Sequence, residues 1–178
     1  LFGNGRGYKD ILLVGLANGV GCGIIVGDET YQSNSGYTPE IGHLSIDYHG
    51  EKCVCGNRGC LEVYLNSVAV LKRMREVTGK FYDYKTFCQL SEEPKIGEIF
   101  ADLVEKLSAG LISTVNILNP ELIILGHNGA WWPEKYLKML ENEINERKFS
   151  NRRAEIRVVP AFYAEKTAVL GAVCNLLV

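Results

Sequence analysis

A histidine and three cysteines concentrated between residues 43 and 60 constrain this chain more than any other feature. Their spacing follows the pattern His43-x9-Cys53-x-Cys55-x4-Cys60. Zinc favours a closed tetrahedral shell, and one imidazole nitrogen with three thiolates is a common structural set. Gly56 and Gly59 permit the tight turns that are needed to direct three sulfur atoms to one point. The pattern therefore predicts a structural zinc site on a loop.

Two alternatives compete with this ligand set. The same cysteines could form disulfide bonds, but no segment reads as a signal peptide. The remaining cysteines also lie among apolar residues, as ordinary buried thiols do: Cys22, Cys88 and Cys174. The second alternative is His49, four residues before Cys53, as the nitrogen ligand in place of His43. We favour His43 as the ligand.

Length and composition limit the class of protein. The chain has 178 residues, of which 47% are hydrophobic, and its formal net charge is −2. These values suit one globular domain or one lobe of a larger protein, and they argue against a disordered or nucleic-acid-coating chain. No apolar run reaches the length of a membrane span, so we expect a soluble, cytoplasmic protein with no membrane partner. The sequence begins at Leu1 without methionine, which suggests a fragment.

The first half of the chain predicts short strands followed by a helix. Apolar runs bounded by Gly, Asn and Asp indicate a β-meander with strands at 11–16, 23–26 and 30–32. Residues 34–57 are loop-rich, with one short strand expected at 44–47. Apolar residues then recur at helical spacing and predict one helix that ends at Gly79: Leu61, Leu65, Val68, Leu71 and Met74.

The second half predicts alternating helices and strands. Asp83 is expected to cap a short helix that runs to Leu90. Further helices are predicted at 96–118, 133–149 and 164–177, strands at 121–125 and 155–159, and a turn at 126–129. A meander followed by this alternation predicts a three-layer α/β lobe with a mixed β-sheet and helices on both faces.

Two local motifs give the chain a family resemblance. Glu40-Ile41-Gly42-His43 precedes the run Cys53-Val54-Cys55-Gly56-Asn57-Arg58-Gly59-Cys60, and Glu62 follows it. Together these motifs resemble the ROK family, whose name joins repressors, open reading frames and sugar kinases. The resemblance implies an actin-like ATPase (ribonuclease H-like) fold. It also implies that residues 1–178 form a single lobe, the C-terminal sugar-binding and dimerisation lobe of a two-lobed protein.

The resemblance also implies the roles of individual residues. A structural zinc ion would be held by His43 and the three motif cysteines, and sugar hydroxyls would be bound by Glu40, His43 and Glu62. Carboxylates suit this task because their oxygens accept two directional bonds from vicinal hydroxyls. If His43 binds the metal through one ring nitrogen, its other nitrogen can face the sugar. The simpler alternative is that Glu40 is a surface charge and Glu62 a charge at a helix start.

Two departures from the kinases of this family bear on activity. Those kinases carry Leu-Gly-Thr-Gly-Ile-Gly, where this chain has Leu16-Ala17-Asn18-Gly19-Val20-Gly21. We therefore interpret Asn18, Gly19 and Gly21 as a vestigial phosphate loop. The second departure is Gly126-His127-Asn128-Gly129, where kinases often carry a run of glycines beside the adenosine. The alternative is neutral drift in a working kinase.

Both departures favour a sugar-responsive transcriptional repressor. The motifs at 42–47 and 56–60 resemble the xylose-repressor and N-acetylglucosamine-repressor branch of the family. The repressor's expected partners are a sugar, further copies of itself in a homodimer or tetramer, and operator DNA bound by a domain outside this chain. An ATP-dependent, glucokinase-like sugar kinase is the first alternative, with ATP and Mg²⁺ as cofactors and the catalytic Asp upstream of Leu1. A non-catalytic sugar-binding module is the second. No catalytic residue is expected within these residues under the repressor hypothesis.

The basic residues and the tryptophan pair give two further expectations. The chain itself is not expected to bind DNA, because its basic residues more naturally form a solvated helix face: Lys72, Arg73, Arg75 and Lys80. Trp131 and Trp132 either cover a subunit interface or pack at the start of a helix, and the sequence favours neither.

Overall fold

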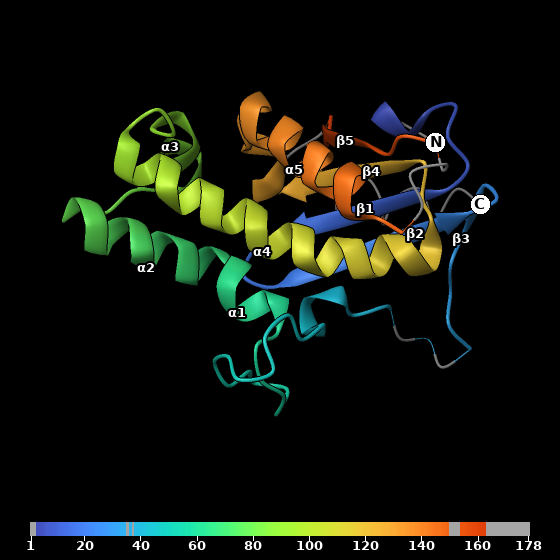
Figure 1. The fold of residues 1–178 in the computed structure, drawn as a ribbon, viewed down its shortest axis with the longest axis horizontal. Helices are drawn as coiled ribbons and strands as arrows, with labels where there is room; N and C mark the ends of the chain where they lie inside the picture. The colour runs from blue at the N-terminus through green and yellow to red at the C-terminus, as the bar shows by residue number, and fades with distance from the viewer. Residues whose placement is uncertain (1–2, 35, 37, 150–153, 163–178) are drawn as a thin grey trace.

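A five-stranded mixed sheet organises the part of the chain that the structure describes. This computed structural model describes residues 3–34, 36, 38–149 and 154–162. The strand order is β3-β2-β1-β4-β5; β1, β2 and β3 are antiparallel neighbours, and β4 and β5 run parallel to β1 (Figure 1). The strands are β1 (Ile11–Leu16), β2 (Val20–Val26), β3 (Glu29–Thr30), β4 (Leu122–His127) and β5 (Arg157–Pro160).

Helices connect the strands and pack with them in one core. The α-helices are α1 (Leu61–Leu65), α2 (Ser67–Thr78), α3 (Tyr84–Gln89), α4 (Pro94–Leu118) and α5 (Glu134–Arg147). Three short 3₁₀ turns complete the described elements: η1 (Gly3–Gly5), η2 (Ile41–His43) and η3 (Asn128–Trp131). The long helix α4 crosses the sheet, and its apolar side chains share one buried cluster with those of the strands (Figure 1). The predicted mixed α/β lobe is confirmed.

Side chains alternate between two environments along β1. Leu12, Val14 and Leu16 are at most 1% exposed and pack toward the helices. The intervening positions Leu13 and Gly15, together with Ala17 just after the strand, line a cavity on the opposite side. This period of two is the geometry of a strand whose two faces differ. The predicted closing helix at 164–177 lies outside the described residues, as does Cys174.

The helix predicted after Cys60 is divided into two, so that prediction is wrong in its continuity. α1 ends at Leu65, and Asn66 restarts the chain as the N-cap of α2, accepting a hydrogen bond from the Ala69 backbone N–H at 2.9 Å. The break resets the helical phase, because the second helix no longer continues the spacing of the first. Val68, expected in the core, is 65% exposed, and Val70 is buried in its place.

Three strand predictions also change in detail. The third strand is β3 alone, because Tyr31 and Gln32 lie beyond its end. The strand expected at 44–47 is reduced to an isolated bridge between Ser45 and Cys60. β4 continues through the predicted turn to His127, and its register beside β1 pairs Gly126 with Gly15. The loop residues at 44–60 are instead organised around the Cys cluster.

The helix caps and the two tryptophans follow local chemistry. Asp83 caps α3 by accepting from the Thr86 N–H at 2.7 Å, and Gly79 ends α2 in the left-handed conformation; both were predicted. Trp132 is 3% exposed, and its Nε1 donates to the Tyr84 hydroxyl at 3.2 Å, so it belongs to the core. Trp131 is half-buried with Lys85 over its ring.

Within the described ranges, no helix combines the length and apolar composition that crossing a membrane would need.

Candidate metal centre and ligand cavity

The four predicted metal ligands converge at one point. The ligand atoms of His43, Cys53, Cys55 and Cys60 all lie within 4.8 Å of one another. His43 Nδ1 is 3.6 Å from Cys53 Sγ, and Cys55 Sγ is 3.7 Å from Cys60 Sγ. Around a tetrahedral zinc ion, two sulfur ligands lie about 3.8 Å apart, and a sulfur and a nitrogen lie about 3.5 Å apart. The donor set and its spacing therefore fit a tetrahedral metal ion.

The structure argues against both alternatives for this loop, disulfide bonds and His49 as the nitrogen ligand. A disulfide needs an S–S separation of about 2.05 Å, and all five described cysteines are free thiols. His49 is not in the cluster; its ring instead lies edge-on to Tyr48, with centroids 5.1 Å apart. Among the described residues, His43 is therefore the histidine that can complete the set.

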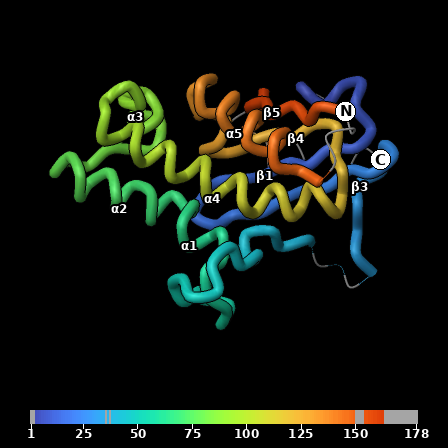
Figure 2. The backbone as a smooth tube through the Cα atoms, in the orientation of Figure 1, coloured from blue at the N-terminus to red at the C-terminus, as the bar shows by residue number. Residues whose placement is uncertain are grey.

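The backbone of the loop is tightly fixed around the cluster. The Cys53 N–H donates to the Asn57 carbonyl and the Gly59 N–H to the Glu51 carbonyl, both at 2.8 Å. Gly59 has a left-handed φ of 61°, and a Cβ at this position would overlap the Asp47 carbonyl. No other residue fits this approach without moving the backbone. The loop between η2 and α1 extends away from the sheet (Figure 2).

The thiols of the cluster differ in their environments. Burial, followed by the neighbouring Cys55 and Cys53 thiols, raises the pKa of Cys60 to about 12. The exposed Cys55 has a lowered pKa, chiefly because of a hydrogen bond from the Asn57 backbone. A divalent cation would overcome the burial cost at Cys60 by replacing the thiol proton with a positive charge.

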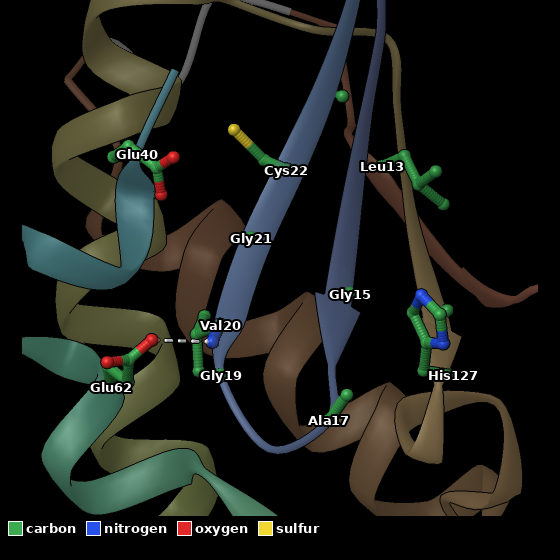
Figure 3. Close-up of a pocket in the computed structure, with 12 residues that line it drawn as sticks. Leu13, Gly15, Ala17, Gly19, Val20, Gly21, Cys22, Glu40, Glu62 and His127 are labelled. Atoms are coloured by element: carbon green, nitrogen blue, oxygen red, sulfur yellow. Dashed lines mark hydrogen bonds between the residues drawn. The ribbon is translucent and has the colours of Figure 1, made fainter. Parts of the chain in front are cut away.

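A cavity of about 500 Å³ lies against the sheet, with its acidic side next to the metal loop. Its floor is mainly backbone, because β1, β2 and β4 present glycines there: Gly15, Gly21, Gly23 and Gly126. Glu40 and Glu62 stand beside β2, and His127 lies on the other side, beside β1 (Figure 3). The cavity thus has an acidic wall, a flat floor of backbone and an imidazole at the far side.

Glu62 is held at the edge of β2. The short strand β3 reaches only Ile25 and Val26, so the start of β2 has no strand on its outer side. There the Val20 N–H donates to Glu62 Oε2 at 3.1 Å (Figure 3). A Cβ on Gly19 would lie 2.8 Å from the same oxygen, so a glycine at this position lets the carboxylate approach.

Glu40 lies at the entrance to η2, the turn that also carries His43. Its Oε1 accepts a hydrogen bond from the Thr38 hydroxyl at 3.5 Å. Gly42 packs directly against the Val20 carbonyl, where a Cβ would overlap it. β2 therefore fixes one carboxylate by a hydrogen bond and the other through the packing of η2.

The turn between β1 and β2 is tied to the junction of α1 and α2. The Ser67 hydroxyl donates to Asn18 Oδ1 at 2.8 Å, and the Ser67 N–H donates to the Ala17 carbonyl at 2.7 Å. Ser67 is 6% exposed, so these bonds lie in a largely dry environment. The Asn18 side-chain oxygen is thus already engaged within the protein.

His127 has a backbone conformation that L-amino acids other than glycine rarely adopt. Its φ is 52° and its ψ is −127°, and its ring Cδ2 would lie 3.0 Å from a Cβ on Gly15. The ring therefore covers the glycine floor at the end of β4. Such backbone conformations cost on the order of 1–3 kcal/mol and persist where packing enforces them.

The structure distributes the predicted site residues in three groups. Glu40, Glu62, Gly19 and Gly21 line the cavity. His43 belongs to the metal cluster and is not among the residues that line the cavity, and Asn18 faces Ser67. Sequence reasoning missed Ser67. It also interpreted Cys22 as an ordinary buried thiol, which is wrong: this thiol is half-buried, lines the cavity and lies beside Glu40 (Figure 3). No sequence signal identified them, because both act on segments distant in the chain.

The mixed sheet in the order 3-2-1-4-5, packed on helices and flanked by a Cys₃His loop, defines a lobe of the actin-like ATPase class. Comparison with known families places it further. The sequence matches the ROK family over residues 1–177, and the chain belongs to that family.

Curated relatives of this chain include both regulators and a kinase. The chain is 30% identical over 173 residues to the xylose repressor of Bacillus subtilis, covering 96% of this chain and 45% of that protein. It is 25% identical to the transcriptional regulator NagC of Escherichia coli, covering 94% and 44%, respectively. It is also 25% identical to the glucokinase of Thermotoga maritima, covering 96% and 59%. The chain thus spans about half the length of the relatives it matches.

Solved structures show the same fold in both functional classes. A ROK transcriptional regulator, a homologue of the E. coli MLC protein, superposes with a TM-score of 0.80 at 24% identity, covering 91% of this chain and 44% of that one. A ROK glucokinase from Streptomyces griseus, in complex with glucose and AMPPNP, also gives 0.80 at 21% identity, covering 96% and 61%. The equal TM-scores establish the fold but do not distinguish a regulator from a kinase.

Proposed function

We propose that this chain is the sugar-binding and dimerisation lobe of a ROK-family, sugar-responsive transcriptional repressor. The observation that carries the proposal is the β1–β2 turn, where the Asn18 side chain is bonded to Ser67 rather than presented to a ligand. In the kinase reading this turn would have to hold phosphate. The naming of the relatives agrees, since xylose repressors and NagC are among the proteins it resembles.

The sugar would bind at the acidic wall of the cavity. Glu62 Oε2 accepts from Val20 and Glu40 Oε1 from Thr38, which leaves the second oxygen of each carboxylate to accept from sugar hydroxyls. His43 Nδ1 faces Cys53 in the metal cluster, so its Nε2 is the nitrogen available to a sugar hydroxyl. Paired carboxylates of this kind distinguish sugars by the direction of their hydroxyls.

We further propose that the metal is zinc and that its role is structural. The four protein ligands complete a tetrahedral shell, which leaves no open position for a water or substrate. The ion would connect η2, which carries His43, to Cys60, the residue immediately before α1. Because Glu40 precedes η2 and Glu62 lies in α1, the metal would fix the spacing of the two carboxylates.

His127 supports a site that does not accept a nucleotide. Its ring covers Gly15, and its strained backbone directs it over the floor beside the turn. Together with the engaged Asn18, this occupies the two places where the kinases of the family are open. We infer that the lobe retains the sugar pocket and has lost nucleotide binding.

The second candidate is the C-terminal lobe of an ATP-dependent sugar kinase. The specific observations in its favour are the match to the Thermotoga glucokinase and the fold shared with the AMPPNP-bound enzyme. A kinase would require Asn18 and His127 to move aside when nucleotide binds. Its catalytic Asp would come from a part of the protein outside these residues.

Regulation would use partners beyond this lobe. The lobe is proposed to self-associate, and operator DNA would be bound elsewhere in the full protein. The basic residues of α2 support the view that this face is not a phosphate footprint, because Lys72 pairs with Glu76 and Arg73 with Asp102, while Arg75 lies over Phe81. A sugar would shift the repressor only through a difference in affinity between its two states.

The decisive experiment uses the full-length protein and measures both activities. Phosphorylation of D-xylose and D-glucose by ATP is followed with a coupled assay, and release of the operator upstream of the protein's own gene is followed by fluorescence anisotropy as sugar is added. The proposal expects operator release and no phosphoryl transfer. Glu40→Gln and Glu62→Gln should weaken the sugar response, because each amide replaces one acceptor oxygen with a donor. Sugar-dependent ATP turnover would establish the kinase instead.

A further inference from the structure

The thiol of Cys22 is bonded to the residue that precedes Glu40. Its Sγ donates a hydrogen bond to the Pro39 carbonyl at 3.2 Å. The Cys22 side chain also lies beside Glu40 (Figure 3). Burial raises the pKa of the Cys22 thiol, and the nearby Ile41 backbone acts against that rise. One side chain on β2 therefore contacts the segment that carries Glu40.

The position of Cys22 in the sheet makes these contacts informative. Cys22 lies on the part of β2 that β3 does not reach, and its side chain points toward Glu40 (Figure 3). It lines the cavity and is half-buried. Glu40 itself is exposed and has only the Thr38 hydroxyl as a described side-chain partner, at 3.5 Å. The orientation of its backbone therefore depends strongly on the neighbouring residues.

Cys22 also has no part in the metal cluster. The cluster comprises His43 and the three cysteines of the loop, and Cys22 is not among them. Its thiol faces the segment 39–41, which enters η2 from the opposite end to His43. The ligand wall is thus fixed at two separate points, by the proposed metal at one end of η2 and by this thiol at the other.

We propose that Cys22 is a positioning residue, whose thiol holds the Pro39–Ile41 segment on β2 so that the Glu40 carboxylate faces the ligand cavity. This inference deepens the proposed sugar site and rests on it for its effect on affinity. The effect on the segment itself is independent of any sugar. Cys22 does not touch the ligand in this role; it acts through Glu40.

The binding experiment compares substitutions that differ only in the donor. Affinity for D-xylose and D-glucose is measured by titration calorimetry in the full-length protein. Cys22→Ala should raise Kd about three- to tenfold, the loss of one positioning hydrogen bond. Cys22→Ser keeps a donor at the same place and should stay within about twofold of the original protein. Cys88→Ala, which removes a buried thiol far from the cavity, is the matched control and should leave Kd unchanged.

A double-mutant cycle tests whether Cys22 acts through Glu40. In a Glu40→Gln background, Cys22→Ala should cause little further loss, because the group that it positions is already altered. An equal loss in both backgrounds would overturn the positioning role. So would a Cys22→Ala protein that binds as tightly as the original, or a Cys22→Ser protein that binds as weakly as Cys22→Ala.

Hydrogen exchange tests the same contact without a sugar. Amide exchange across residues 40–43 of the ligand-free protein should become several-fold faster in Cys22→Ala and remain unchanged in Cys22→Ser and Cys88→Ala. Unchanged exchange in Cys22→Ala would refute the inference even if sugars bind. If neither sugar binds the original protein but the exchange difference is present, the positioning contact stands and the proposed sugar specificity fails.

Discussion

At the scale of single residues, the Glu62 carboxylate has one structural contact and one proposed ligand contact. Its Oε2 satisfies the Val20 N–H at an edge of β2 that lacks a strand partner, and the proposed sugar would use the other oxygen. The sequence indicated Glu62 through the motif around it. The hydrogen bond to Val20 could not be predicted, because it forms only where β3 is too short to pair with the start of β2. The convergence of ligand atoms was therefore predictable where a local motif carries it, as with Cys53 and Cys60, and contacts were not predictable where distant segments meet.

The approach of Gly59 to Asp47 leads to a first prediction. Gly59→Ala should destabilise the loop, because a Cβ there overlaps the Asp47 carbonyl and the residue also has a left-handed φ. Gly56→Ala is the matched control: its φ is 94°, but a Cβ would meet nothing within 4 Å. The control should cost about 1–2 kcal/mol from backbone strain alone. Gly59→Ala should cost distinctly more.

Two measurements on these variants give the test. The free energy of unfolding is obtained from urea denaturation, and metal content is obtained by mass spectrometry of the purified proteins. Gly59→Ala should show both a lower free energy of unfolding and a lower metal content than Gly56→Ala. Equal values for the two variants would mean that the loop tolerates a side chain at residue 59.

At the scale of elements, the break between α1 and α2 is the feature that sequence periodicity concealed. Apolar spacing from Leu61 to Met74 fits a continuous helix, whereas Asn66 interrupts it and brings the Ser67 amide and hydroxyl to the β1–β2 turn. The long helix α4 was predictable because its apolar stripe is uninterrupted: Ile99, Leu103, Leu107, Leu111 and Val115 are all buried. A helix end that is determined by a tertiary contact leaves no such signal.

The link between this junction and the turn gives a second prediction. Ser67→Ala should lower the free energy of unfolding by about 1–2 kcal/mol, since it leaves Asn18 Oδ1 without its partner in a largely buried place. Combined with Asn18→Ala, the two losses should be less than additive, with a coupling of at least about 0.5 kcal/mol. Urea denaturation of the four proteins of the cycle measures this coupling. Strict additivity would mean that the hydrogen bond contributes nothing to stability.

Contacts between α2 and α4 give a third prediction, which concerns pH. Asp102 on α4 pairs with Arg73 on α2 at 2.6 Å and with Lys106 one turn along α4. Partial burial acts to raise the pKa of Asp102, but the hydrogen bonds and charges of Lys106 and Arg73 outweigh it and hold the pKa below its ordinary value. A carboxyl group with a lowered pKa stabilises the fold fully above its unfolded pKa of about 3.9, and this contribution is lost as pH falls through the folded value.

The substitution Asp102→Asn isolates this contribution. At pH 7 it should lower the free energy of unfolding by up to about 1 kcal/mol, the usual range for a partly exposed pair. The difference between the two proteins should stay constant from pH 7 to pH 5 and narrow below about pH 4. Asp28→Asn, at the more exposed pair with Lys9, is the control and should show a smaller effect. A difference that grows as the solution is acidified would contradict the assignment.

At the scale of the whole molecule, the sequence indicated the class of fold and the family, and the structure added how the site is assembled. The order of elements predicted a mixed α/β lobe, which the sheet order β3-β2-β1-β4-β5 confirms. The cavity could not be predicted, because its floor is made of glycine backbone from three strands whose register only the folded sheet defines. The placement of His127 over Gly15 depends on that register in the same way.

Removal of the metal gives the fourth prediction. Treatment with a strong chelator should lower the melting temperature by several degrees and weaken sugar binding at least about tenfold, because the ion proposed here connects η2 to the start of α1. Far-UV circular dichroism should change little, since the described members of the buried core cluster lie outside loop residues 44–60. Re-addition of one equivalent of Zn²⁺ should restore both properties. A metal-free protein that melts and binds sugar as before would refute the structural role.

The alternation along β1 has a consequence for how such a lobe can diversify. One set of side chains packs in the interior: Leu12, Val14 and Leu16. The other set lines the cavity and would face its ligand: Leu13, Gly15 and, just after the strand, Ala17. Because neighbouring positions have different surroundings, a substitution at a cavity position need not disturb the packed interior. Related proteins could therefore change the small molecule that they bind, or change from catalysis to signalling, while they keep the same fold. On this one short strand, the positions that maintain the fold are different from the positions that determine what the cavity binds.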